Sequence, residues 1–334
     1  MVMPVFLRCA QYFGFVSTEI STSLLLWLIL TKASSRFGDY KWLMLSYAIY
    51  SIIYGFVEIA AQPIMHVDGA CMFMYADSFL KHNKTLGHQL TSIYCASFGL
   101  CVSLLATHFL YRFVAVCRPN DLHRFEGVKL LKLYILPTFA SVLWYLVCAS
   151  LGPTQLKSEY MRDVIWENYR ENTSEVGYMA VLYYYTDNLG NLVIHWWDLL
   201  CVLLVFCIMG SCIMTMLTCG CKTFHKMDSV GSLSKKTREL NRQLFRTLVL
   251  QTLVPFCTMF APVGSLLIVP MFSIKIGKAA NMPSMYASLY PALDASIAIL
   301  MIRDFRETVL CRRRFGRRKN TVNTTTESTS HMPE

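Results

Sequence analysis

Seven long apolar stretches determine what this chain can fold into. A hydrocarbon core about 30 Å thick takes roughly 20 helical residues to cross, and each stretch has about that length. Apolar residues make up 54% of the chain and charged residues only 16%, against about 45–50% and 25% in soluble domains. The sequence therefore predicts an all-α membrane protein, a seven-transmembrane helix bundle. Its predicted spans are 11–31, 42–64, 89–112, 131–151, 192–217, 244–268 and 282–302.

The spans leave little chain for anything else. Residues 1–310 are predicted to form the membrane domain, and residues 311–334 a basic and then Thr/Ser-rich cytoplasmic tail. Among the connections, 152–190 is long enough to form a substantial cap, and it contains no cysteine that could bridge to the third span. The stretch 11–31 is interpreted as a retained helix, because cationic residues follow it and no cleavage signal is evident.

Positive charge predicts how the bundle is oriented. The N-terminus and every second connection hold eight Lys and Arg residues, whereas the other connections and the C-terminus hold 23. The positive-inside rule then places the N-terminus outside and the C-terminus inside. The net charge of +10 is explained by this topology and by attraction to anionic inner-leaflet lipids, so the bilayer and not nucleic acid is the expected partner.

Two N-x-S/T sequons agree with this orientation. Asn83 begins one and Asn172 begins another, and both lie in connections assigned to the outside, where glycosylation acceptors belong. Both asparagines are therefore predicted to be glycosylated.

Sequence motifs of enzymes are absent. The chain contains no HExxH, GxSxG, phosphate-binding loop or CxxC motif, and these are the patterns that organise common catalytic sites. Asp198 and Asp294 lie at different depths of their spans, which does not suit a paired-acid protease. We expect neither catalysis nor a metal or other cofactor.

Four residues in the outer half of the bundle are candidates for ligand binding. Glu58 lies in the outer third of the second span, and His195, Trp196 and Asp198 begin the fifth. A carboxylate inside a bilayer is costly and usually faces the bundle interior, which suits a pocket wall. An interhelical hydrogen bond, with the tryptophans in an interfacial belt, explains the same residues equally well.

Five residues in the inner half are candidates for a conformational switch. Asp294 follows Pro291 in the seventh span, and proline permits a helix to kink. Pro255 similarly interrupts the sixth span, and Tyr111 and Arg112 close the third. A latch at Asp294 and a partner contact at Arg112 are one interpretation. A static hydrogen bond and a cytoplasmic anchor are the other.

Five groups of motifs resemble those of a known family. They are FGDYKWLM at 37–44, PIMH at 63–66, HFLYRFVAVCRP at 108–119, RQLFRTLVLQTLVPF at 242–256, and YPALD at 290–294 with IRDFR at 302–306. In this order and spacing, the chain resembles the nematode seven-transmembrane chemoreceptors of the Str (serpentine receptor class r) type, which includes olfactory receptors.

The resemblance implies a function. Such receptors bind a small odorant molecule and switch a heterotrimeric G protein, as multi-pass proteins of the plasma membrane in sensory-neuron cilia. It places Tyr111 and Arg112 at the G protein, and Pro291 and Asp294 at the seventh-helix switch. A ligand-gated channel or a small-solute transporter is the alternative function. Transporters usually contain internal repeats, and none is evident in this sequence.

Overall fold

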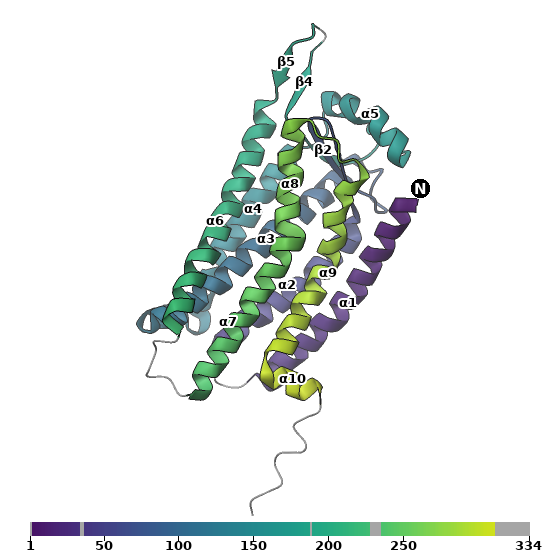
Figure 1. Ribbon diagram of the computed structural model, residues 1–334. Helices are drawn as coiled ribbons and strands as arrows, with labels where there is room; N and C mark the ends of the chain where they lie inside the picture. Colours follow the sequence, from purple (N-terminus) through teal and green to yellow (C-terminus); the bar gives the residue numbers. More distant parts are fainter. Residues whose placement is uncertain (1, 34–36, 188, 228–234, 311–334) are drawn as a thin grey trace, which may run out of the picture.

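The computed structural model describes residues 2–33, 37–187, 189–227 and 235–310 as a helical bundle with a small sheet at one end (Figure 1). Six of the described helical segments are long and apolar enough to cross a membrane, and a seventh is bent by 95° near its end. The predicted seven-helix bundle is confirmed. The six segments are Val5–Lys32, Tyr40–Ala61, Lys84–Cys117, Gly127–Ser150, Trp196–Met227 and Arg238–Phe272, and the bent one joins Lys278–Met301 to Arg303–Val309.

The helices and strands follow each other along the chain with short connections. The α-helices are α1(Val2–Lys32), α2(Tyr40–Ala61), α3(Lys84–Cys117), α4(Ile135–Ser150), α5(Gln155–Tyr169), α6(Trp196–Met227), α7(Lys235–Pro255), α8(Ala261–Ile268), α9(Met282–Met301) and α10(Arg303–Val309). The strands are β1(Pro63–Asp68), β2(Cys71–Ala76), β3(Tyr178–Leu182), β4(Tyr184–Thr186) and β5(Leu192–Ile194). The 3₁₀ helices are η2(Pro119–Phe125), η3(Gly127–Tyr134), η5(Val269–Phe272) and η6(Lys278–Asn281), and η4(Phe256–Phe260) is a π-helical turn.

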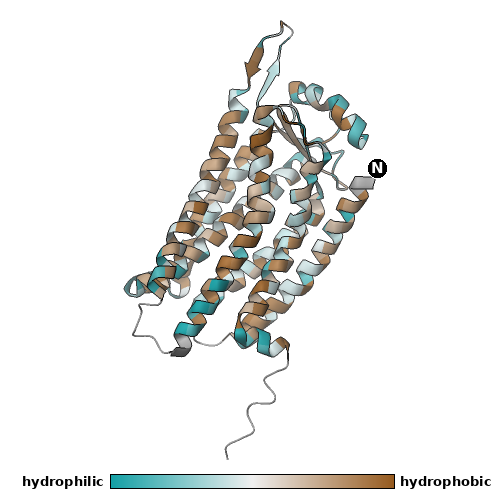
Figure 2. Ribbon diagram, in the orientation of Figure 1, coloured by the Kyte–Doolittle hydropathy of each residue, from teal (hydrophilic) through white to brown (hydrophobic). Residues whose placement is uncertain are grey.

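Apolar side chains cover the outside of the bundle, and many polar ones lie inside. Ile20 and Phe224 are at least 60% exposed, while Thr22 and Asp294 are buried. Figure 2 shows the apolar band along the helices, with hydrophilic residues concentrated at α5, α10 and the inner end of α7. This is the arrangement expected when the surrounding solvent is hydrocarbon, because polar groups must find partners inside the protein.

Two predicted span boundaries are wrong. The second span was predicted to reach residue 64, but α2 ends at Ala61 because Gln62 adopts a left-handed conformation, with φ 45°, and Pro63 starts β1. The fifth span was predicted to begin at residue 192, but residues 192–194 form β5 and the helix begins at Trp196. In both places apolar residues of a strand resemble a continuation of the helix.

The three-stranded sheet β1–β2–β3 is antiparallel, and it is buried on both faces. One face carries methionines in register, with Met65 opposite Met74 and Met74 opposite Met179, and this face packs onto the bundle. The other face carries Phe73 and Tyr178, which pack beneath α5. A strand that is covered on both faces does not alternate between polar and apolar residues. The segments PIMHVD and CMFMYA therefore lack the pattern by which a strand is recognised.

Segment 152–190 forms the cap that the sequence predicted. It contributes α5, which lies across the sheet, and β3, the edge strand of that sheet (Figure 1). Met161 and Ile165 of α5 are almost fully buried against the sheet. Burial raises the pKa of Tyr178 to about 12, so its phenol stays neutral and remains hydrogen-bonded to Ser158, with 2.7 Å between the two oxygens.

The sixth span is interrupted at Pro255, as the sequence predicted. Pro255 ends α7, the π-helical turn η4 follows, and α8 begins with Pro262 in its first turn. A π-helical turn inserts an extra residue into an α-helix. The segment therefore continues across the bundle, although its regular hydrogen-bond pattern is interrupted.

The described ends of the chain lie at opposite ends of the bundle. The start of α1 lies beside the sheet, and α10 lies at the far end, across the axis of α9 (Figure 1). This agrees with an odd number of spans. Which end faces the cytoplasm stays a prediction from the charge count, and the predicted tail at 311–334 lies outside the described residues.

Candidate functional site

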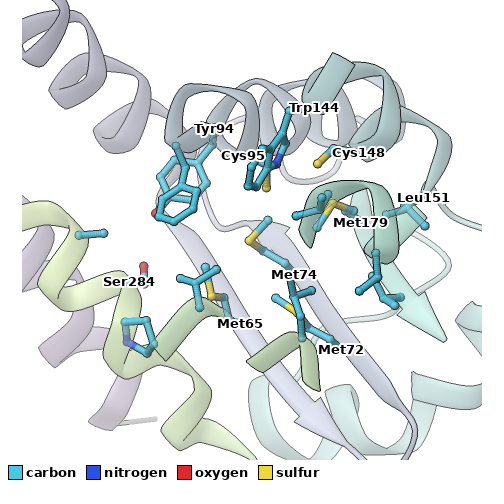
Figure 3. Close-up of a pocket in the computed structure, with 18 residues that line it drawn as sticks. Met65, Met72, Met74, Tyr94, Cys95, Trp144, Cys148, Leu151, Met179 and Ser284 are labelled. Atoms are coloured by element: carbon cyan, nitrogen blue, oxygen red, sulfur yellow. The ribbon is translucent and has the colours of Figure 1, made fainter. Parts of the chain in front are cut away.

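An apolar cavity of about 70 Å³ lies between the sheet and the halves of the helices nearest to it (Figure 3). Its roof is the methionine face of the sheet, formed by Met65, Met72, Met74, Met179 and Val181. Its walls come from α3, α4, α6, α8 and α9.

The cavity lining contains no charged residue and few polar groups. Tyr94 and Ser284 provide hydroxyl groups, and the Ser284 hydroxyl donates to the Pro63 carbonyl oxygen over 3.3 Å. The thiols of Cys95 and Cys148 also face the cavity. An ion bound here would have no countercharge, and its desolvation would be costly. The site therefore suits an uncharged, mainly apolar molecule with one or two hydrogen-bonding groups.

A buried ion pair lies beside the roof of this cavity. Lys157 Nζ is 2.8 Å from Asp198 Oδ2, and the two side chains are 2% and 0% exposed. The same Asp198 oxygen accepts a hydrogen bond of 2.8 Å from the Leu182 backbone N–H. Lys157 also donates to the Ala180 carbonyl oxygen at 2.8 Å. The pair thus joins α5, β3 and the start of α6.

The four predicted ligand-binding residues do not line this cavity. Asp198 is committed to Lys157, and His195 Nδ1 lies 3.0 Å from Asp198 Oδ1. Trp196 is 69% exposed on the outside of the bundle. Glu58 is buried in α2 and is not part of the cavity lining. A direct ligand contact by any of the four stays a prediction.

Two of the predicted switch residues lie on the helix that also forms a cavity wall. Ser284 and Ala287 of α9 line the cavity, and Pro291 follows one turn further on. Proline cannot donate a backbone hydrogen bond to the residue four positions earlier, so the Ala287 carbonyl has no such partner. Asp294 lies below the proline and is 3% exposed.

Asp294 connects α9 to the sixth span. Its Oδ2 accepts a hydrogen bond of 2.9 Å from Gln251 Nε2 in α7, and Tyr290 OH lies 3.4 Å from its Oδ1. Tyr290 OH is also 2.5 Å from Tyr47 OH of α2. A small polar cavity of about 20 Å³ adjoins Asp294 and Gln251. The acid is therefore hydrogen-bonded to a neighbouring helix in this structure, beside a proline that permits bending.

The structure brings Tyr111 and Arg112 together with Tyr40 of α2 at the end of the bundle away from the sheet. The Arg112 guanidinium lies over the Tyr40 ring, with 3.7 Å from Cζ to the ring centroid. Arg112 Nη1 donates to Asn241 Oδ1 of α7 at 3.3 Å. Tyr111 stacks on Tyr40, with 5.6 Å between the ring centroids. Arg112 is only 4% exposed, so this cation holds three helices together and does not project into solvent.

Sequence comparison agrees with this arrangement. Residues 7–310 match the profile of a family described as "Serpentine type 7TM GPCR chemoreceptor Str". The chain belongs to the Str family of serpentine chemoreceptors. Serpentine receptor class r-10 of Caenorhabditis briggsae and that of Caenorhabditis elegans are each 33% identical to it over 302 residues, which cover 90% of this chain and 88% of each relative. The G-protein coupled receptor str-33 of C. elegans is 24% identical over 304 residues, with the same coverage of both chains.

Membership of the Str family confirms several predictions. The family consists of seven-transmembrane, G-protein-coupled chemoreceptors and not of enzymes. A small-molecule ligand, a G protein and a multi-pass position in the plasma membrane are therefore expected of this Str receptor in general terms. The alternatives of a channel or a transporter receive no support from these relatives.

The two predicted glycosylation sites lie at the same end of the bundle as the sheet. Asn83 is exposed and caps the first turn of α3, where its Oδ1 accepts from the Leu86 backbone N–H at 3.0 Å. Asn172 lies in the turn after α5 and is half-buried, with Nδ2 donating to Glu175 at 3.0 Å. Their modification stays a prediction.

Sequence reasoning missed most of the cavity. Its roof methionines lie in segments taken for the end of a helix and a loop, and the partner of Asp198 is 41 residues away in α5. One signal was present, because Met72 and Met74, like Met179 and Val181, recur with the period of two expected for one face of a strand. That spacing was too short a pattern to be decisive alone.

Proposed function

We propose that this chain is a chemosensory receptor that binds a small, uncharged, odorant-like molecule in the methionine-roofed cavity and switches a heterotrimeric G protein at its inner end. One observation carries the proposal. Helix α9 forms part of the cavity wall through Ser284 and Ala287, and the same helix carries Pro291 and Asp294. A ligand that changes the position of α9 therefore acts directly on the hydrogen bond between Asp294 and Gln251.

The ligand class follows from the cavity lining. Methionine is flexible and polarisable, so a methionine roof adapts to ligands of different shapes. The hydroxyl groups of Tyr94 and Ser284 are the polar groups of the lining available to orient a ligand. Small ketones, esters, alcohols and aromatic compounds fit these requirements, whereas organic acids and amines in their charged forms do not.

The proposed switch works by population shift. A ligand favours one arrangement of the bundle only by binding it more tightly than the other. In the structure, Arg112 is held between Tyr40 and Asn241. We expect the active arrangement to move α7 away from α3, with the break at Pro255 and η4 as the hinge, so that the Arg112 contact opens toward the G protein.

The cellular setting belongs to the same proposal. Glycosylation at Asn83 and Asn172, a role in olfaction and sensory perception, and a position in the cilium of a sensory neuron are the properties expected of a receptor for environmental molecules. They are supported by the resemblance of the motifs and by the position of both asparagines at the end of the bundle that the charge count assigns to the outside.

The test is expression of the receptor in cells with a calcium or cAMP readout. Uncharged ligands are compared with charged analogues of similar size, such as a ketone and the corresponding carboxylate. The variant Ala287→Phe fills the cavity from a wall that is buried, and Leu293→Phe adds the same ring to the exposed side of the same helix, where Leu293 is 47% exposed.

We expect uncharged ligands alone to evoke a response, Ala287→Phe to abolish it and Leu293→Phe to retain it, at equal amounts on the cell surface. A response that Ala287→Phe leaves intact would place the ligand elsewhere. A ligand-evoked current in cells that lack the G protein would show that the alternative function, a channel, is correct.

A further inference from the structure

One edge of the sheet that roofs the cavity has no neighbouring strand. Its backbone groups are hydrogen-bonded to other parts of the cap and bundle instead. β3 is the edge strand of the sheet, and an edge strand presents unpaired N–H and C=O groups. Here the Ala180 N–H donates to the Leu151 carbonyl oxygen at 3.0 Å, at the end of α4. The Ala180 carbonyl accepts from Lys157 Nζ and the Leu182 N–H donates to Asp198 Oδ2, each at 2.8 Å. The ion pair occupies the place of a fourth strand.

The residues between these contacts are the ones that close the cavity. Met179 and Val181 alternate with Ala180 and Leu182 along β3, and their side chains line the cavity from above. The backbone groups held by Lys157 and Asp198 thus fix the position of two roof side chains. A substitution in the ion pair would therefore alter the position of the cavity roof, although neither charged residue lines the cavity.

A covalent tether of this cap to the bundle is not available, because residues 152–190 contain no cysteine. The buried ion pair therefore has a role that a disulfide could otherwise fill. Removal of one partner from a buried pair is strongly destabilising, because the other charge is left in a low-dielectric environment. Both partners are at most 2% exposed, so this condition is met.

We propose that the Lys157–Asp198 ion pair is a latch that holds the sheet closed over the cavity and sets how readily molecules reach the cavity from the outer side. Lys157 and Asp198 are positioning residues for the roof, and neither lines the cavity. The inference rests on the cavity and not on the proposed function, because it concerns access and is tested without a ligand or a G protein.

Two cysteines that line the cavity can report on its accessibility. Cys95 and Cys148 line it, and both thiols are free. Cys101 lies deeper in α3, is 2% exposed and does not line this cavity. The purified full chain in lipid nanodiscs is treated with 2-(trimethylammonium)ethyl methanethiosulfonate, which its charge confines to water. Labelling rates at each cysteine are then measured by mass spectrometry of peptides.

We expect Lys157→Met to accelerate labelling of Cys95 and Cys148 by about tenfold or more, with the rate at Cys101 unchanged. The matched control is Arg162→Met, which removes an exposed cation from the same helix and should leave all three rates at their wild-type values. Equal acceleration at Cys101 would indicate general unfolding and would overturn the latch, as would a cavity rate that matches the control.

Two further variants cover the case in which Lys157→Met does not fold. Asp198→Asn keeps an acceptor for the Leu182 N–H and should give a smaller acceleration. The double variant Lys157→Met with Asp198→Leu leaves no unpaired buried charge, which favours folding, yet it leaves the edge groups of Ala180 and Leu182 without these partners. It should still label faster than wild type, and wild-type rates in the double variant would refute the proposal.

Discussion

The Arg112 guanidinium lies against the face of the Tyr40 ring, at 3.7 Å from Cζ to the ring centroid, at the end of the bundle away from the sheet. This contact joins α3 to α2, and the hydrogen bond from Arg112 to Asn241 joins α3 to α7. Because Arg112 is 4% exposed, the structure represents an arrangement in which this cation is withheld from any partner on the inner side.

Replacement of Tyr40 by leucine should raise signalling in the absence of ligand. A cation–π contact at a desolvated site contributes about 2 kcal/mol, so its loss should increase basal activity by up to roughly thirtyfold. Tyr40→Phe keeps the ring and loses only the hydroxyl group that lies 3.3 Å from His108 Nδ1, and it should remain close to wild type. Nucleotide exchange on a purified G protein measures both variants. Equal basal activity in Tyr40→Leu and wild type would show that the contact does not hold the resting arrangement.

Loss of the Gln251 amide should destabilise the receptor. Gln251 Nε2 donates to Asp294 Oδ2 at 2.9 Å, and a buried acceptor that loses its donor costs about 1–3 kcal/mol. We expect Gln251→Leu to lower the thermal unfolding midpoint of the purified receptor. The double variant Gln251→Leu with Asp294→Leu removes both partners and should recover part of the loss. If the double variant loses as much stability as the two single variants together, or more, the two residues are not coupled as the structure indicates.

Helix α1 should not tolerate a side chain at Gly14. A Cβ atom there would lie 2.6 Å from the Ser288 backbone oxygen of α9, closer than two such atoms can approach. Gly14→Ala should therefore separate α1 from α9 and reduce the amount of folded receptor. Gly210→Ala in α6 is the matched control, because no atom lies within 4 Å of its added Cβ and alanine favours the helix by about 1 kcal/mol. Detergent-extracted receptor measured by size-exclusion chromatography distinguishes the two, and identical yields would argue against tight α1–α9 packing.

Glycosylation should test the orientation of the whole bundle. If the sheet end faces outward, Asn83 and Asn172 receive glycans, and Asn83→Gln and Asn172→Gln should each remove one from the receptor expressed in animal cells. The shift in gel mobility after N-glycosidase treatment measures this. Wild-type receptor that carries no glycan, together with an N-terminal tag protected from antibody on intact cells, would show the reverse orientation.

The bundle could be predicted from the sequence because a bilayer requires long apolar helices and restricts where cations lie. The same reasoning failed at residues 63–68, where β1 continues directly from α2. A strand with both faces buried and a helix end are equally apolar, so composition does not distinguish them. The cavity could not be predicted from the sequence for the same reason, because its roof consists of such strands.

Asp198 shows a different limit. Its position near the outer end of a span was recognised, and its burial was expected. Its partner Lys157 lies in an amphipathic cap helix, where a lysine ordinarily faces water. No local pattern distinguishes this lysine from Arg162, which is exposed. The pairing appears only when α5 is placed over the sheet.

The π-helical turn η4 has a consequence for the geometry of ligand sensing. Successive residues of an α-helix are rotated by about 100°, so the extra residue in Phe256–Phe260 turns everything after it by that angle. Gln251 before the turn faces Asp294, and Val263 and Leu267 after it face the cavity. Without the turn these two faces would point in different directions. The π-helical turn thus allows one continuous segment to line the cavity at one end and to contact Asp294 at the other.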